Sequence, residues 1–435
     1  MGLKQEKFNP SILLLILMVS VFGHGVTSSI CDNGLCSCFP RYKNITSVDC
    51  SCNLTKQGFD FTAADFGMQF HEVRNFYVTD CDDGVVFRTN AFRDLGKLQN
   101  LYLGKVRKVE FESGVFQRLA RLSLQNIQDV KFGERAFMGA RDLYSIEIHR
   151  ATIPRLHSHS LFDVRGLYSL ELDEVALHHV EKDAVKIDFR HPESYVLVNN
   201  CTIGNIESKG IILKAKNFSM TKSALDGLSS DAVNIISSDL IQTSESNFGK
   251  NLEKNAINMV APVVNIRSNT FKLLPKGIIE GIKFEENKKI IFINNTVYDI
   301  DTDNILDGMS SLIKIAEIKG NHFPCSCSIR VPHQALREFS QNNFCTIKCN
   351  ITLSDFGALI EDRKVCTLNK SEPDESEICS SVVNSTPDQR RGRTPSYFRT
   401  TQITTKMNKT VNSSERIQFI PVLLFCVLFT VVIES

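Results

Sequence analysis

The chain has 435 residues, of which 42% are hydrophobic, and its 50 basic and 49 acidic residues leave a formal net charge of +1. This balance argues against nucleic acid as a partner and against a membrane bound through charge. The length permits two or three ordinary domains or one long repeat array.

Residues 1–29 have the composition of a secretory signal peptide. Lys4 and Lys7 precede an apolar run over residues 12–22, and small residues follow up to Ser29. The run is too short for an N-terminal membrane helix, which needs about 20 apolar residues. We therefore expect the mature chain to be secreted and to fold in an oxidising compartment.

Eleven of the 14 cysteines form two clusters near the ends of the remaining chain, whereas Cys81 and Cys201 stand alone and Cys426 lies in the C-terminal tail. In a secreted protein such clusters predict disulfide-linked caps, here over residues 30–70 and 324–380. A zinc site fits less well, because no histidine pairs follow at the spacing of a zinc finger. The cysteines assigned to the two caps are Cys31, Cys36, Cys38, Cys50, Cys52, Cys325, Cys327, Cys345, Cys349, Cys366 and Cys379.

The connectivity of these cysteines is open at this stage. One account forms three bridges between Cys31 and Cys81 and three between Cys325 and Cys379, and leaves Cys201 as a buried thiol. Another leaves Cys81 and Cys201 both reduced, with an odd cysteine in one cap. Sequence alone does not distinguish them.

Short apolar pairs recur between the cysteine clusters. The second residue of each pair falls at positions 78, 103, 124, 148 and 172, in the pattern Leu-x-x-Leu-x-Leu-x-x-(Asn/Cys)-x-Leu. Phe92, Phe116, Phe137 and Phe162 track the same period, and we expect each to fill the wedge behind a strand. The spacing predicts a right-handed solenoid of stacked parallel strands over residues 71–323, an α/β-type repeat that is predominantly β.

The pattern becomes degenerate after residue 180, and this half has a second interpretation as a β-helix-like section. Cys81 and Cys201 fall on the Asn/Cys position of the unit, where a side chain points inward and bonds the backbone. The later apolar pairs that we assign to the same frame are Val196–Val198, Leu213–Ala215, Val233–Ile235, Val264–Ile266, Ile291–Ile293 and Ala316–Ile318.

Over residues 31–380 the chain resembles the extracellular leucine-rich repeat (LRR) family. The spacing Cys31-x4-Cys36-x-Cys38-x11-Cys50 is similar to the N-terminal cap of that family, and the segment from Gly320 to Cys327 to the start of its C-terminal cap. That cap usually carries a tryptophan, which this chain lacks, and Phe323 is the candidate substitute. The resemblance implies an LRR solenoid that binds proteins on its concave sheet.

Asn-x-Ser/Thr sequons are dense for a chain with a signal peptide, which predicts a glycoprotein. Two of them, Asn408 and Asn412, lie close to the C-terminal tail. The sequons expected to carry sugar are Asn44, Asn53, Asn200, Asn217, Asn294, Asn350, Asn369 and Asn384.

Residues 381–414 are rich in Ser and Thr and should form an extended stalk. Within the stalk, Arg390–Arg393 is either a furin-like cleavage site or a solvated charge run. Residues 415–435 are a short polar spacer and an apolar run, the pattern of a signal for a glycosylphosphatidylinositol (GPI) anchor, with a short tail-anchored span as the alternative. The small residues expected to receive the lipid are Asn412, Ser413 and Ser414.

With this tail, the chain is similar to insect GPI-anchored LRR adhesion proteins of the connectin and chaoptin type. That resemblance implies a glycoprotein on the extracellular face of the plasma membrane that mediates adhesion or recognition. The partner would be a cell-surface or secreted protein, including a second copy of this chain. An innate-immune co-receptor and a structural organiser of the extracellular matrix are the alternatives.

The repeat frame locates the expected partner surface on the N-terminal strands. We place Asn200, Asn217 and Asn294 in the outward columns at the strand ends, so the sequon-free stretch over about residues 70–190 should bind the partner. Tyr and Arg are preferred at such interfaces. The residues assigned to it are Tyr77, Tyr102, Tyr144, Glu147, His149, Arg150, Tyr168, Glu171 and Asp173.

Motifs of catalysis are absent from the sequence: it has no Gly-rich phosphate loop, nucleophile elbow or zinc-protease motif. We therefore expect neither enzymatic activity nor a cofactor. His157, His159, His178 and His179 form the best candidate polar group, with His157 beside Glu181 in the repeat frame. They are either ligands of a divalent metal or solvated turn residues.

Overall fold

The computed structural model describes residues 30–31, 34, 36–41, 44–53, 58–253, 255–274, 289–300, 316–325, 337–347, 349–363 and 375–384. The described residues up to Val382 belong to one compact unit. The expected signal peptide, the Arg390–Arg393 site and the tail with its lipid-attachment residues lie outside these ranges. Within them, no helix combines the length and the apolar character that crossing a bilayer requires.

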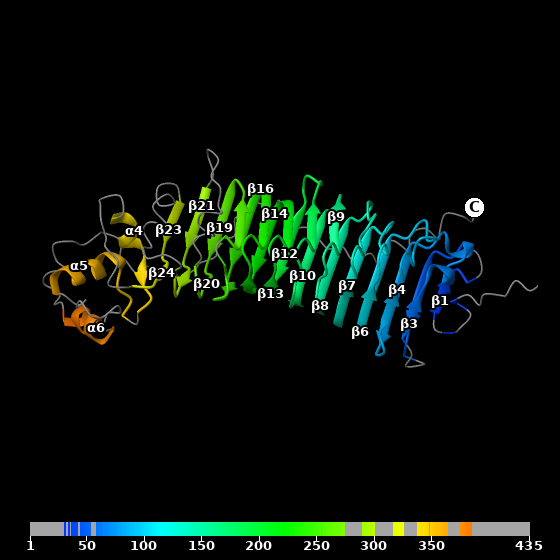
Figure 1. The fold of residues 1–435 in the computed structure, drawn as a ribbon, viewed down its shortest axis with the longest axis horizontal. Coiled ribbons are helices and arrows are strands. Elements are labelled where there is room, and N and C mark those ends of the chain that lie inside the picture. Colours follow the sequence, from blue (N-terminus) through cyan, green and yellow to red (C-terminus); the bar gives the residue numbers. More distant parts are fainter. Residues whose placement is uncertain are drawn as a thin grey trace, which may run out of the picture. The chain divides into compact units, whose positions relative to one another are not determined.

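The fold is a predominantly β solenoid in which parallel strands stack for about 11 turns. Figure 1 shows the strands following one another in chain order. One side of the solenoid, the first ladder, contains the strands that the repeat frame predicts for residues 76–172 and continues to both sides of them. Its members are β2 (Ser47–Ser51), β4 (Asn75–Cys81), β6 (Asn100–Phe111), β7 (Arg121–Phe132), β8 (Ser145–Ile153), β10 (Ser169–Leu177), β12 (Tyr195–Asn199), β14 (Ile211–Thr221), β16 (Val233–Ser244), β19 (Val263–Arg267), β21 (Lys289–Ile293) and β23 (Ala316–Lys319).

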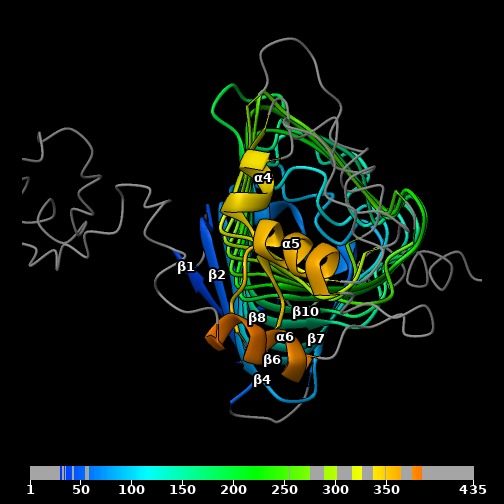
Figure 2. The same ribbon diagram turned by 90° about the vertical axis from the view of Figure 1, so that its left-hand side faces the viewer.

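A second ladder runs beside the first, built from the ends of the long strands and from shorter ones. In the middle turns a third ladder closes the cross-section, visible when the stack is viewed from its end (Figure 2). The short strands of the second ladder are β3 (Phe59–Phe61), β5 (Val85–Phe87), β13 (Thr202–Ile206), β15 (Ala224–Leu228), β17 (Asn247–Phe248), β20 (Thr270–Phe271), β22 (Thr296–Val297), β24 (His322–Phe323) and β25 (Phe344–Cys345). The third ladder contains β9 (Leu161–Arg165), β11 (Val185–Asp188), the first halves of β14 and β16, and β18 (Ile257–Val260).

Both ends of the stack carry cap elements. β1 (Cys36–Phe39) pairs antiparallel with β2, and the short 3-10 helices η1 (Ala63–Asp65) and η2 (Met68–Phe70) follow. At the other end lie α4 (Arg337–Asn342), α5 (Leu353–Arg363) and α6 (Glu375–Asn384). β25 pairs with β24, so the second ladder continues across residue 324, where we expect the C-terminal cap to begin.

Disulfides hold both caps, and they decide between the two sequence-based accounts. Cys81 is bonded to Cys52, so the account that leaves Cys81 reduced is wrong. Cys201 is a buried free cysteine, and burial raises the pKa of its thiol to about 11. Cys327 and Cys366 lie outside the described residues. The other bridges within those residues are Cys31–Cys38, Cys36–Cys50, Cys325–Cys345 and Cys349–Cys379.

The repeat frame of the later half needs correction at three places. Leu213–Ala215 and Val233–Ile235 lie on the third ladder, beside Ile187 and Met259 respectively. The corresponding first-ladder residues are Phe218 to Met220 and Ile241 to Thr243. In β21 the inward pair is Ile290 and Phe292, one residue before the pair that we expected. A three-sided turn has alternating apolar residues on more than one side, so periodicity alone selects the wrong side.

From β4 to β23, each described turn bends between the first and second ladders at a residue with positive φ. Ten of these residues are not glycine, although the left-handed conformation costs an L-residue about 1–2 kcal/mol. Except at Gly320, the bend places a polar side chain where the first-ladder part of the strand ends, and we call this row of residues the bend column. The residues at the bends are Asp80, Lys105, Asn126, Arg150, Glu174, Asn200, Lys222, Glu245, Ser268, Asn294 and Gly320.

The inward position after this bend changes chemistry along the stack. In the N-terminal turns this residue is apolar, as at Val106 and Ile127. The backbones of neighbouring strands pair with each other there on both sides of the bend. From Cys201 onward a side-chain oxygen one turn further on accepts the backbone N–H instead. We name this buried column the polar ladder, and its residues are Cys201, Ser223, Ser246, Asn269, Asn295, Asn321 and Asn343.

Stacked phenylalanines fill the two ends of the core but not its middle. Phe87, Phe111 and Phe132 stack in the N-terminal turns with centroids 5.2–5.4 Å apart, and Phe248 and Phe271 stack at 4.5 Å further on. Between these two stacks lies an apolar cavity of about 100 Å³, lined by residues of β8 to β18 and bounded by Phe132, Phe137 and Phe248. We call this cavity the lumen.

Phe162 explains part of the lumen and corrects one expectation. Phe92, Phe116 and Phe137 are buried wedges, as predicted. Phe162 is instead half-buried on the outside, with its ring 4.8 Å from that of His159 and 5.1 Å from Nζ of Lys186. The smaller Leu161 points into the core in its place, so the turn lacks an aromatic filler.

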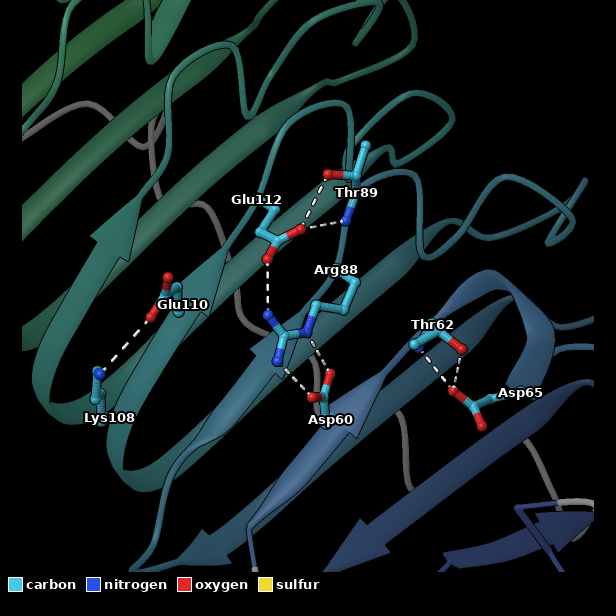
Figure 3. A network of polar contacts seen from close by, with 8 residues as sticks. All are labelled: Asp60, Thr62, Asp65, Arg88, Thr89, Lys108, Glu110 and Glu112. Atoms are coloured by element: carbon cyan, nitrogen blue, oxygen red, sulfur yellow. Dashed lines mark hydrogen bonds and ion pairs between the residues drawn. The ribbon is translucent and has the colours of Figure 1, made fainter.

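Arg88 ties the N-terminal cap to the next two turns (Figure 3). Its Nε and Nη2 donate to both carboxylate oxygens of Asp60 at 2.7 and 2.6 Å, and its Nη1 donates to Oε1 of Glu112 at 3.0 Å. Thr89 donates its backbone N–H and its hydroxyl to the other Glu112 oxygen. The guanidinium therefore bridges three successive turns through charge-assisted hydrogen bonds.

This bridge predicts an acid-sensitive contribution to stability. The hydrogen bond from Arg88 lowers the pKa of Asp60; burial opposes the shift of Glu112, but hydrogen bonds from Arg88 and Thr89 still lower its pKa. Carboxyl groups with depressed pKa values stabilise the fold above their unfolded values, near 4, and lose that effect as the pH falls through the folded values. We expect the Tm difference between wild type and Arg88→Met to be present at neutral pH and to close below about pH 4. A difference independent of pH would contradict this account.

Candidate protein-binding surface

The outward residues of the first ladder lie in columns, one residue per turn. Backbone register places Tyr77, Tyr102, Ser123, Glu147 and Glu171 side by side. The frame predicted for these five turns is therefore confirmed. Because neighbouring parallel strands are about 4.8 Å apart, side chains of one column contact each other directly.

Four aromatic rings meet where β8, β10 and β12 begin, and we call them the aromatic cluster. The rings of Tyr144 and Tyr168 stack with centroids 4.9 Å apart and an interplanar angle of 6°. His191 lies edge-on to Tyr168 at 4.9 Å, and Tyr195 does so at 5.4 Å. Tyr144 is 40% exposed, and the guanidinium of Arg121 lies 6.0 Å from the centre of its ring.

Tyr195 connects the aromatic cluster to the acidic column. Its hydroxyl donates to Oε1 of Glu171 on the neighbouring turn. Burial and this carboxylate raise the pKa of Tyr195 to about 12, so the phenol stays protonated at physiological pH. Glu171 is thereby held beside the rings and presents a fixed acceptor at the surface.

Polar side-chain pairs follow the other edge of the same turns, where the strands end. Nδ1 of His149 lies 3.6 Å from Oδ2 of Asp173, and Nε of Arg150 lies 3.5 Å from Oε2 of Glu174. Asn199 donates to the other oxygen of Asp173 at 2.6 Å. Arg150 and Glu174 occupy the left-handed bends and are exposed, so they can exchange these contacts for contacts with a partner.

Tyr77 and Tyr102 form a separate pair. Their centroids are 6.2 Å apart, and the Tyr102 hydroxyl donates to Oε1 of Gln125 at 3.2 Å. The Tyr102 ring lies over Gly104, where an added Cβ would come within 2.7 Å of its hydroxyl oxygen. Ser123 occupies the same column on the next turn, so this pair does not continue into the aromatic cluster.

The sequons border this surface, with one correction to their expected places. Asn200 and Asn294 lie at exposed bends where their first-ladder strands end, as expected. The placement of Asn217 is wrong: it lies at the beginning of its first-ladder strand, in register with Tyr195. Sugars on Asn200 and Asn217 would therefore flank the surface from both strand ends, immediately after the aromatic cluster.

The remaining sequons are spread over the caps. Asn44, Asn53 and Asn350 are exposed. Asn369 lies outside the described residues. Asn384 is the last residue of α6, but only its backbone is described.

The histidine group makes contacts between turns. Nδ1 of His157 lies 3.2 Å from Oε1 of Glu181, as the repeat frame predicts, and Nε2 of His179 lies 3.3 Å from Oε1 of Glu207. A backbone N–H from Ser158 is the main cause that lowers the pKa of Glu181. The described part of the chain contains no group of three or more His, Cys, Asp or Glu residues arranged to hold a metal ion.

Sequence reasoning missed three residues of the aromatic cluster and its surroundings. Tyr195 could have been identified from the repeat frame, because it directly precedes the apolar pair Val196 and Val198. His191 precedes that strand by four residues, and Arg121 reaches Tyr144 from the turn before. Neither carries a periodic signal, since each contact depends on how a turn folds back.

Comparisons with known proteins assign no family to the chain. No family model matches the chain, and a search of curated proteins finds no relative.

Proposed function

We propose that this chain is an extracellular LRR-type glycoprotein that binds a protein partner through the first-ladder surface of β4 to β10. The observation that carries the proposal is the aromatic cluster on the same turns as the polar pairs His149–Asp173 and Arg150–Glu174. Tyr, His and Arg side chains on a rigid sheet offer contact area at little entropic cost. Disulfides in both caps support an oxidising destination, since such bonds persist mainly outside the cytosol.

The proposal includes attachment to the outer leaflet through a GPI anchor. Its support is the residue pattern at the two termini, an N-terminal apolar run and a short C-terminal one after small residues. A chain anchored in this way would meet its partner on the extracellular side, where the partner is a cell-surface or secreted protein. Binding to a second copy on an opposing cell is the version that suits adhesion.

Replacing Tyr144 and Tyr168 with Ala, and Glu147 and Arg150 with Gln, in one variant is expected to abolish aggregation of cells that display the protein. Central aromatic and Arg residues each contribute about 2 kcal/mol or more at hot spots, so affinity should fall at least about 100-fold. Ectodomain released by a phosphatidylinositol-specific phospholipase provides the soluble reagent for measuring Kd.

The matched control replaces outward residues that share the column of Glu147 on the later turns, namely Ser219, Gln242, Asn265 and Glu317. This variant should aggregate cells like wild type. Loss of binding in the control, or full binding by the first variant, would remove the N-terminal turns as the partner surface. Failure of the phospholipase to release the protein would contradict the anchor alone.

A further inference from the structure

Two carboxylates on the first ladder lack an opposite charge. Glu147 on β8 and Glu171 on β10 occupy the same column and are in register on neighbouring parallel strands, whose backbones lie about 4.8 Å apart. Like charges directly opposite each other on a sheet destabilise it. Within the described part of the chain, Glu147 makes no hydrogen bond or ion pair, and Glu171 accepts a hydrogen bond from the neutral hydroxyl of Tyr195.

The basic side chains nearby contact other groups. Arg150 lies against Glu174, and the guanidinium of Arg121 lies over the ring of Tyr144. Over the residues that the structure describes, no Lys, Arg or His side chain is within ion-pair distance of either carboxylate of the column. The surface therefore carries two adjacent negative charges that the chain itself does not compensate.

A buried hydroxyl beside these carboxylates also lacks a partner. Ser145 precedes Glu147 by two residues on β8, so both side chains lie on the same face of the strand. Ser145 is 4% exposed, and its Oγ has no hydrogen-bond partner among the described residues. A buried hydroxyl without a partner costs free energy, which a donor from a ligand recovers. This observation is independent of the charges and indicates a donor at the same place.

A guanidinium suits these three acceptors better than other cations. Its N–H donors form a rigid planar fork that matches carboxylates, whereas an ammonium concentrates its donors at one point. The N-terminal cap already contains such an arrangement, since Arg88 donates to Asp60 and to Glu112, which belong to different turns. An arginine can therefore contact the carboxylates of two turns at once.

The aromatic cluster supplies apolar surface next to the acidic pair. The Tyr195 hydroxyl contacts Glu171, so the rings reach the acidic column. Tyr144 is 40% exposed and stacks on Tyr168. The methylene groups of a long side chain pack on such rings while its charged end contacts carboxylates. Apolar groups also exclude water from the charge-assisted hydrogen bonds and thereby strengthen them.

We propose that the protein partner places an arginine side chain against Glu147 and Glu171, with the Ser145 hydroxyl as a third acceptor. This inference rests on the proposed protein-binding function and specifies the chemistry of the partner at that surface. A lysine would meet the same charge with a poorer fit, so its equal binding is an outcome of the test.

The test uses random peptides displayed on phage as probes, selected on the glycosylated ectodomain. Wild type should enrich peptides that contain arginine, and fluorescence anisotropy gives the Kd of the tightest one. Citrulline in place of its arginine keeps the shape without the charge and should raise Kd about tenfold or more. Lysine should restore only part of the affinity.

Glu147→Gln with Glu171→Gln should raise the Kd of the arginine peptide by a similar factor and leave that of the citrulline peptide unchanged. Glutamine keeps an acceptor for the Tyr195 hydroxyl, so the aromatic cluster should persist. Ser145→Ala should weaken the arginine peptide about threefold without lowering Tm, because its hydroxyl has no partner in the described part of the free protein.

Asp239→Asn with Glu245→Gln is the matched control, since it removes the same charge from two exposed carboxylates of a later turn. It should bind the arginine peptide like wild type. The proposal is overturned if wild type enriches no arginine peptide, if lysine or citrulline replaces the arginine without loss, or if both double variants weaken binding equally.

Cell aggregation separates this proposal from the one on which it rests. Glu147→Gln with Glu171→Gln should reduce aggregation. If this variant aggregates cells like wild type while the variant changed at Tyr144, Tyr168, Glu147 and Arg150 does not, the arginine contact is wrong and the protein-binding surface stands. Thermal unfolding checks that each variant is folded.

Discussion

Asn295→Leu is expected to destabilise the C-terminal turns by about 3 kcal/mol or more. Oδ1 of Asn295 accepts the backbone N–H of Asn269 at 2.9 Å, and its Nδ2 donates to the carbonyl of Ile266 at 3.0 Å. Leucine fits the volume but leaves both buried groups unpaired, and each unpaired group costs about 1–3 kcal/mol. Urea unfolding measures the loss, and hydrogen exchange locates it in β19 to β24.

Two further variants isolate the cause. Asn295→Ser keeps one acceptor, as Ser223 and Ser246 do at the equivalent position, and should lose less stability than the leucine variant. Asn247→Ala removes an exposed asparagine next to the same column and should be nearly neutral. Equal effects of Asn295→Leu and Asn247→Ala would show that the polar ladder does not stabilise the turns.

Replacing Cys52 and Cys81 together with Ser is expected to cost about 3–4 kcal/mol and to open the N-terminal cap. The bond spans 29 residues, and removing it restores the conformational freedom of that loop to the unfolded chain. It joins the segment after β2 to the end of β4, so the first turn would lose its covalent link to the next. The earliest cuts in limited proteolysis should then fall on the N-terminal side of Phe87.

Cys201→Ser is the informative comparison for the disulfide variant. Cys201 is unbridged and buried, and serine occupies the same column at Ser223 and Ser246 on the following turns. We expect little change in Tm and no new cleavage in the cap. A loss as large as that of the double variant would mean that cysteine burial, rather than the bridge, stabilises this fold.

The N-terminal half of the solenoid was predictable because each turn there has one side with a strict apolar pair. Leu101 and Leu103 align with Leu122 and Leu124 in the structure as they do in the sequence. The later turns have three strand-bearing sides, so Val233 and Ile235 satisfy the same pattern from the third ladder. Periodicity reports that a side chain points inward, but not which side of the turn it belongs to.

For the partner surface, the sequence predicted which residues of successive turns align, but not the contacts made by residues outside the repeat. The stacking of Tyr144 on Tyr168 follows from the repeat, and the structure has it. The place of Asn217 depended on the shifted frame, and the contact of His191 depended on a turn without periodic residues.

The lumen gives the middle turns a distinct mechanical character. Unfolding a protein with an internal void reduces the volume of the system, because water fills the space that side chains left empty. Turns packed with stacked phenylalanine rings have little such volume to lose, whereas those from β8 to β18 enclose about 100 Å³. We therefore expect hydrostatic pressure to destabilise the middle turns of the stack more than its two ends.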